Sequence, residues 1–245
     1  IGSLVDQWLV TLERKSKELK ELFDHKNKDL LKEKEKTKEL VYSLLPREIA
    51  EQKMMSSGPI SPQVFSNCSF FYSDIQGFTG IVADLTNLED GGPMDVVGML
   101  DNLYTIMDEA IGKHNVVKIE TIGDAYVVVS GLPVPDINGS AHARHIAAFA
   151  LDVLSTTKDI TVPRLNNRPV YMRIGIHSGS CVAGVAGNYM YHYCIYGKEP
   201  RYANNLESSG EANKIHMSND MRHILENNFQ NQFSFVERKP SVNIP

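Results

Sequence analysis

The chain has 245 residues, of which 42% are hydrophobic and 22% are charged. This balance is ordinary for a soluble globular protein and suffices for one sizeable domain with an appendage. The formal net charge of −5 excludes a nucleic-acid-binding protein that depends on a broad basic surface. Only three cysteines occur, without the paired spacing of a zinc site, which favours reduced thiols in a cytosolic setting.

A heptad pattern runs through residues 1–45, a charge-rich segment without proline. One seam holds Val5, Leu12, Leu19, Lys26, Glu33 and Leu40, and the other holds Leu9, Ser16, Phe23, Leu30, Thr37 and Leu44. The pattern predicts a parallel dimeric coiled coil, with a single charged helix lying on its own domain as the alternative. In a homodimer Lys26 would face Lys26 and Glu33 would face Glu33, so the seams favour a different partner chain.

Residues 46–66 are predicted to link this helix to a globular domain over residues 67–245. Pro46 ends the coil, and a polar stretch with two further prolines follows it. The apolar segment 69–75 then predicts a buried strand, followed by a turn at Gly77. We expect the globular domain to continue beyond Pro245.

The central part of the chain alternates helical and strand patterns. Apolar residues at steps of three and four between Val96 and Ile111 predict a helix. Segment 116–131 predicts two strands around a tight Gly-Asp turn, and a second amphipathic helix is expected over 146–153, before a strand over 170–179. This order predicts an α/β fold of the α+β sandwich type, with a mixed sheet and helices on one face.

Two aspartates follow predicted strands at positions where metal ligands are expected. Asp74 ends the first strand, and the turn after it, with Gly77, Phe78 and Thr79, opens a helix whose backbone N–H groups can cradle phosphate. Asp124 lies in the turn of the predicted hairpin. If the strands are neighbours, two carboxylates converge on one point, the minimum for Mg²⁺ or Mn²⁺ bound with substrate phosphates. The alternative is that each Asp only caps a turn.

Longer strings make the pattern more specific. They are "FYSDIQGFTGIV", "DNLYTIMDEAI", "VVKIETIGDAYVVVSGLP", "AHARHIAAFAL", "MRIGIHSGSCVAGVAG" and "CIYGKEPRYANNLESSGEANKIHMS". In this order and spacing the chain resembles the class III nucleotide cyclase catalytic domain, and in detail the guanylyl cyclase branch. The resemblance reaches from about Leu40 to the C-terminus. It implies the class III cyclase fold, with a ferredoxin-like βαββαβ core preceded by a coiled-coil helix.

The resemblance also implies a dimer that converts GTP to cyclic GMP and pyrophosphate between its subunits. One subunit would hold two divalent metals, Mg²⁺ or Mn²⁺, through Asp74 and Asp124, with the backbone carbonyl of Ile75 as a further ligand. Its Arg173 would contact the triphosphate. The metals would activate the ribose 3′-hydroxyl for attack on the α-phosphorus and neutralise the leaving pyrophosphate. The opposite subunit would supply base-reading residues and an Asn and an Arg that act in the transition state.

Glu120 and Cys194 fall where guanylyl cyclases carry their guanine-reading pair. A carboxylate accepts hydrogen bonds from guanine N1–H and the 2-amino group, and a thiol can meet O6, so the pair suits guanine and mismatches adenine. The alternatives are a solvated strand residue for Glu120 and a small buried hydrophobe for Cys194.

Segment 194–208 departs from the family. Guanylyl cyclases continue after the Cys with a pattern similar to L-F-G-D-T-V-N-T-A-S-R-M-E-S. Here Arg201 stands at the transition-state Asn position and Asn205 at the Arg position, and Pro200 fixes the backbone nearby. An Asn brings no positive charge to the phosphate, which we expect to cost roughly 10²–10³ in rate.

Because the metal-binding residues are complete while this segment is altered, the chain resembles the α subunit of the soluble guanylyl cyclase. We predict a guanylyl cyclase subunit that needs a second cyclase subunit, and a heterodimer is favoured over a homodimer. An upstream sensor is expected, membrane-linked rather than soluble, with the catalytic domain in the cytoplasm. Two alternatives stay open: an inactive pseudo-cyclase that dimerises or regulates, and a weakly active homodimer in which Arg201 replaces the missing Arg.

Overall fold

A computed structural model describes residues 4–56, 58–88, 90, 92–134, 139–187 and 190–239. Within it the helices are α1 (Leu4–Leu44), α2 (Arg47–Met55), α3 (Phe78–Thr86), α4 (Gly92–Ile111), α5 (Gly139–Thr157), α6 (Lys198–Ser208), α7 (Asn219–Asn228) and the 3₁₀ turn η1 (Pro163–Leu165). The strands are β1 (Gln63–Ile75), β2 (Val117–Ile122), β3 (Ala125–Ser130), β4 (Thr161–Val162), β5 (Arg168–Pro169), β6 (Met172–Ala186), β7 (His192–Tyr196) and β8 (Lys214–Met217).

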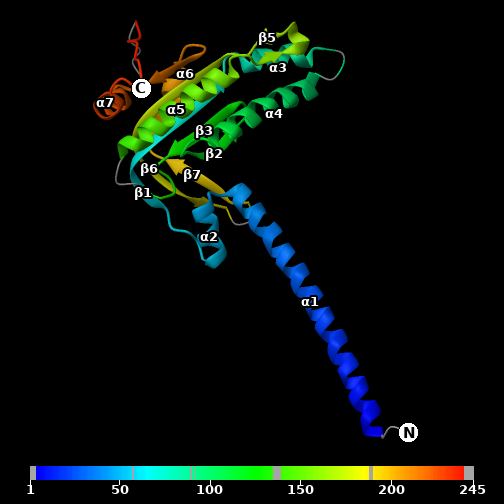
Figure 1. Cartoon of the computed structure of the whole chain (residues 1–245). Helices are drawn as coiled ribbons and strands as arrows, with labels where there is room; N and C mark the ends of the chain where they lie inside the picture. The colour runs from blue at the N-terminus through cyan, green and yellow to red at the C-terminus, as the bar shows by residue number, and fades with distance from the viewer. Residues whose placement is uncertain are drawn as a thin grey trace.

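The main sheet is mixed, as predicted. Its order is β2-β3-β1-β6-β7, with antiparallel neighbours throughout, and β8 pairs parallel with β6. The two long strands β1 and β6 form its centre (Figure 1). β4 and β5 make a separate small sheet beside η1. The strand predicted over 170–179 runs on to Ala186, and the strand predicted over 69–75 begins earlier, at Gln63.

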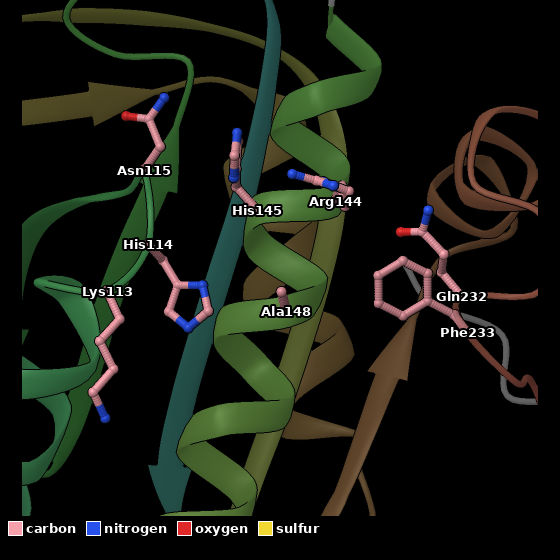
Figure 2. Close-up of a pocket in the computed structure, with 8 residues that line it drawn as sticks. All are labelled: Lys113, His114, Asn115, Arg144, His145, Ala148, Gln232 and Phe233. Carbon is pink, nitrogen blue, oxygen red and sulfur yellow. The ribbon is translucent and has the colours of Figure 1, made fainter.

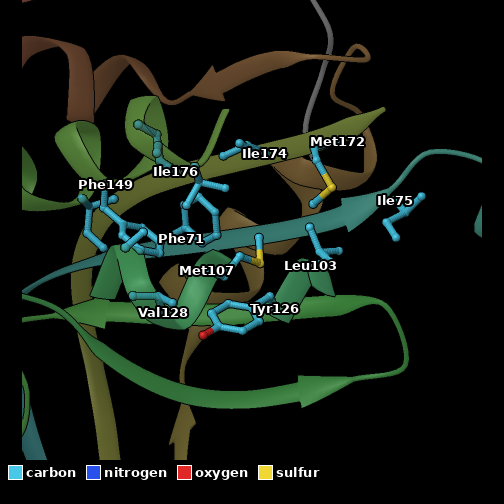
Figure 3. Close-up of a cluster of buried hydrophobic side chains, with 14 of the residues drawn as sticks. Phe71, Ile75, Leu103, Met107, Tyr126, Val128, Phe149, Met172, Ile174 and Ile176 are labelled. Carbon is cyan, nitrogen blue, oxygen red and sulfur yellow. The ribbon is translucent and has the colours of Figure 1, made fainter. Parts of the chain in front are cut away.

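The larger hydrophobic core fills one face of the sheet. Leu103 and Met107 of α4 and Phe149 of α5 pack there against the strands (Figure 3). Phe149 meets Phe71 of β1 edge to face, with ring centroids 4.9 Å apart, a geometry that aromatic pairs prefer. Strand side chains alternate between the two faces, so Phe71 belongs to this core while its neighbour Phe70 belongs to a second cluster on the other face.

The second face carries helix α6 and the exit from the long N-terminal helix. Ala203 of α6 packs there with Phe70, and Leu45, Ile49 and Ala50 join the same cluster. The prediction of helices on one face was therefore wrong for α6 and α2. Helix α2 itself lies inside the segment predicted as a linker, where the polar sequence gave no helical pattern.

Helix α1 projects from this body as a single long helix and ends at Leu44, just before Pro46 (Figure 1). The apolar residues of its predicted seams, such as Leu12, Leu19 and Phe23, are exposed in the single chain. The side chain of Val5 lies outside the described residues. A long exposed apolar seam is typical of a surface that a partner covers, and the coiled coil itself stays a prediction.

Candidate active site

The structure brings the carboxylates of Asp74 and Asp124 together at one end of the sheet. The backbone N–H of Ile75 donates to Asp74 Oδ1 at 2.8 Å and to Asp124 Oδ2 at 3.1 Å. The cause is the register of β1 and β3, in which Ser73 lies opposite Tyr126, so the ends of both strands meet. Gly123 turns the chain back with φ of 63°, a conformation that favours glycine, and places Asp124 beside Asp74.

The nearby carboxylate of Asp74 affects the proton affinity of Asp124. Burial raises the pKa of Asp124 to about 7, and the neighbouring Asp74 adds to the rise through a hydrogen bond and its charge. The backbone N–H of Ile75 opposes the rise. When both carboxylates are ionised their charges repel, so a divalent metal ion bound between them would reduce the repulsion. Turn capping alone, the alternative weighed for each Asp, does not explain why both share one N–H.

Arg173 lies directly beside Asp74 on the neighbouring strand β6. The two residues are opposite each other in the β1–β6 register, and Arg173 Nη2 lies 2.9 Å from Asp74 Oδ2. On its other side Arg173 Nε lies 3.0 Å from Oε1 of Glu207, a contact with ion-pair distance but poor hydrogen-bond alignment. Arg173 thus links the carboxylate pair to helix α6.

Glu207 is a residue of this cluster that sequence analysis missed. Its side chain is 6% exposed, and burial raises its pKa while the charge of Arg173 opposes the rise. Gly175 lets the helix approach, because a Cβ there would meet the backbone N of Glu207 at 2.2 Å. The available signal was a carboxylate on the buried face of an amphipathic helix, where charged residues are rare unless paired.

The turn after Asp74 has the predicted form. Gly77 is left-handed with φ of 73° and precedes α3, which begins at Phe78. The first N–H groups of a helix, here those of Phe78 and Thr79, have no partner within the helix and are available to an anion. The turn adjoins the carboxylate pair because Ile75 belongs to both.

Glu120 and Cys194 occupy different strands. Glu120 is exposed on β2, four residues before Asp124, and Cys194 is half-buried on β7. The two strands approach each other to within 8 Å between Cα atoms, although they are not hydrogen-bonded neighbours. Glu120 of β2 and Tyr72 of β1 both lie opposite Val127 of the strand between them. Burial raises the pKa of Tyr72, and the charge of Glu120 adds to the rise.

Arg201 and Asn205 lie one helical turn apart on α6, and so share a side of the helix. Arg201 is exposed and Asn205 is half-buried. The helix is anchored at its start, where Glu199 Oε2 lies 2.7 Å from Nε2 of the buried His177. The altered residues therefore stand on an ordered helix rather than in a collapsed segment.

A family model for the adenylate and guanylate cyclase catalytic domain matches residues 60–243. The chain belongs to this family. Among similar proteins, the speract receptor of Strongylocentrotus purpuratus is 41% identical over 224 residues, and retinal guanylyl cyclase 1 of Bos taurus is 41% identical over 223 residues. Each alignment covers 91% of this chain and 19% of the relative, so the chain spans about a fifth of the length of these relatives.

Solved cyclase domains share the fold. The guanylate cyclase domain of RhGC from Catenaria anguillulae, determined in complex with GTP, is 29% identical, with a TM-score of 0.58 over 67% of this chain and 84% of that chain. These relatives confirm the predicted resemblance to the guanylyl cyclase branch and the predicted class III cyclase fold.

Cyclase domains of this class use divalent metal ions, and the residues of this chain fit such a group in part. Asp74 and Asp124 provide two hard oxygen ligands. Among the described residues there is no group of three or more His, Cys, Asp or Glu that could hold a metal on its own. The remaining ligands would have to be backbone or substrate oxygens, which is how Mg²⁺ is commonly bound beside phosphates. Within the described range, no helix has the length and apolar character to cross a membrane.

Proposed function

We propose that this chain is a guanylyl cyclase catalytic subunit that converts GTP to cyclic GMP and pyrophosphate at a dimer interface. The observation that carries the proposal is the convergence of the Asp74 and Asp124 carboxylates on the N–H of Ile75. The family match and the guanylyl cyclase relatives support the reaction class.

In this proposal Asp74, Asp124 and the backbone carbonyl of Ile75 hold two Mg²⁺ or Mn²⁺ ions. When bound, the ions would lower the pKa of the ribose 3′-hydroxyl of GTP and neutralise the negative charge of the leaving pyrophosphate. Arg173 would bind the triphosphate, and the position of its guanidinium 2.9 Å from the proposed metal ligand Asp74 supports this role. The N–H groups of Phe78 and Thr79 beyond Gly77 would add donors for phosphate oxygens.

The residues that this chain would contribute to the second site of the dimer are less complete. Glu120 and Cys194 are proposed to read guanine for the second site of the dimer. Arg201 and Asn205 on α6 replace the Asn and Arg expected to act in the transition state, so that second site lacks its charge stabilisation. We therefore propose one working site per dimer, completed by a different cyclase subunit.

The test is cyclic GMP formation from GTP and Mn²⁺ in a mixture of two forms of this chain. One form is unchanged. The other carries Arg201→Asn and Asn205→Arg together with Asp74→Ala, so that it offers a restored α6 but no metal pair. We expect each form alone to be nearly silent and the mixture to be about 10²-fold more active or better.

Two controls make the result interpretable. The Arg201→Asn, Asn205→Arg form with Asp74 intact should be active alone, because each chain then has both faces. Dimer formation is measured by analytical ultracentrifugation. A silent mixture of verified dimers would instead favour a pseudo-cyclase, and robust turnover by the unchanged chain would favour the homodimer.

We further propose that the catalytic domain lies in the cytoplasm, downstream of a sensor domain. The support is that several relatives are receptor-type or retinal guanylyl cyclases, much longer than this chain. In this proposal the long helix α1 transmits a change from such a sensor to the dimer, and its exposed apolar seam supports that role. Co-expression with candidate cyclase subunits, followed by purification of the complex, tests whether α1 selects a different partner.

A further inference from the structure

A cavity of about 470 Å³ lies away from the proposed active site. Three parts of the chain line it: the connection from α4 to β2, the N-terminal half of α5, and the segment after α7. Figure 2 shows Arg144 and Ala148 on α5 between the rings of His114 and Phe233. Asn115 lies just before β2, whereas Asp124 follows the other end of β2, so the two sites lie at opposite ends of one hairpin.

The lining is positively charged, in contrast to the whole chain with its net charge of −5. Lys113 and Arg144 bring cationic side chains to the lining, and His114 and His145 bring two imidazole rings. Asn115 and a glutamine add amide donors, and no carboxylate is among the described residues that line the cavity. A cavity with this composition attracts anions and repels cations.

The carboxylate of Asp152 lies beside the cationic side chains of the cavity. Asp152 Oδ2 lies 3.2 Å from His114 Nε2 and 3.9 Å from Lys113 Nζ, so it offsets part of the charge on that side. Arg144 is different, because no carboxylate among the described residues lies within 4.0 Å of it. Its guanidinium instead lies 5.6 Å from the ring centroid of Phe229, a contact that orients the group without neutralising it.

We propose that this cavity binds a small soluble molecule that carries a phosphate group. Arg144 offers a planar set of donors that matches phosphate oxygens, and Lys113 adds a second charge. Asn115 supplies a neutral donor. Phe233 and Ala148 provide an apolar wall for the organic part of the ligand, so the site combines the few polar groups and apolar surface typical of small-molecule pockets.

Calorimetric titration of the 245-residue chain in chelator-containing buffer tests the site, with inorganic phosphate and phenyl phosphate as probes. We expect saturable binding of both, tighter for phenyl phosphate because its ring can contact Phe233. Arg144→Gln and Lys113→Gln should each weaken binding about tenfold, the effect of losing one charge-assisted hydrogen bond. Lys158→Gln, a change of an exposed cation elsewhere, should leave binding unchanged.

The Arg173→Gln variant tests whether the phosphate binds at the proposed active site instead of the cavity. If Arg173→Gln abolishes phosphate binding while Arg144→Gln does not, the anion occupies the proposed active site and the inference is wrong. Equal weakening by Lys158→Gln and Arg144→Gln would show only general charge attraction and would also overturn it. Equal affinity for the two probes would contradict the proposed contact of Phe233 and Ala148 with the organic part of the ligand. The readout is binding without metal, so the outcome does not depend on cyclase activity.

Discussion

The end of strand β1 and helix α6 are packed against each other, yet they differ in how far they keep the residues expected of a cyclase. The strand end has Asp74 beside Asp124, with Arg173 next to them. The helix has Arg201 and Asn205 where an Asn and an Arg are expected. In the proposed function, the first region binds metal and phosphate, and the second lacks the positive charge expected to act in the transition state.

The altered helix nevertheless supports the intact region. Glu207 of α6 contacts Arg173, and Glu199 at the helix start pairs with the buried His177 of β6. On the same helix Arg201 is exposed and Asn205 is half-buried. We therefore propose that α6 has two separable tasks: to serve a site across the dimer and to hold Arg173 within its own chain. Under this proposal the replaced residues affect only the first task.

The largest expected effect comes from the strand end. Asp124→Ala in the unchanged chain of the mixed assay should lower cyclic GMP formation by more than about 100-fold, since even outer-shell residues of metal sites cost 10 to 100-fold. Asp101→Ala is the matched control, because Asp101 is an exposed carboxylate on α4. The measurement is the initial rate with Mn²⁺ at saturating GTP. Retention of full activity by Asp124→Ala would remove the carboxylate pair from the mechanism.

A smaller effect should follow from Glu207, which we assign as a positioning residue. Glu207→Gln removes the charge that orients Arg173 but keeps the side-chain shape. We expect the KM for GTP to rise about tenfold with little change in kcat, since uniform binding of the triphosphate is weakened.

The exposed Glu109→Gln on α4 is the control for the loss of one negative charge. Thermal unfolding of the Glu207→Gln chain is measured in parallel. If KM and kcat stay at their original values in a folded chain, the Arg173 contact does not position the substrate-binding group.

The sequence predicted the strand end better than its surroundings. The Gly-Asp turn, the strand before Asp74 and the helix after Gly77 all follow from local signals, and the structure confirms them. That Asp74 and Asp124 share the N–H of Ile75 depends on strand order, which local patterns do not contain. The roles assigned to these residues stay predictions.

Glu207 and α2 escaped sequence analysis for a different reason. Glu207 is buried because Gly175, 32 positions earlier in the chain, leaves room for the helix backbone. Helix α2 has a polar sequence, and it is stabilised by Ile49 and Ala50 packing against the sheet rather than by its own propensity. Both depend on contacts between distant segments, which one sequence does not reveal.

The smallest expected effect concerns the proton on Asp124 in the metal-free chain. Its pKa is about 7 in the folded protein and near the ordinary 3.8 when unfolded, so folding takes up a proton between these values. The resulting stabilisation is fully present below about pH 4 and is lost as the pH rises through 7. Urea unfolding in the presence of a chelator should therefore show that this group lowers the free energy of unfolding between pH 5 and 8. The expected change is on the order of 1 kcal/mol, after allowance for solvent screening of a half-buried carboxyl.

Asp124→Asn, which cannot titrate, should flatten that slope, and Asp74→Asn should reduce it by removing the neighbouring charge. An identical pH slope in the unchanged and Asp124→Asn chains would mean that the two carboxylates do not form a strained pair at the end of the sheet.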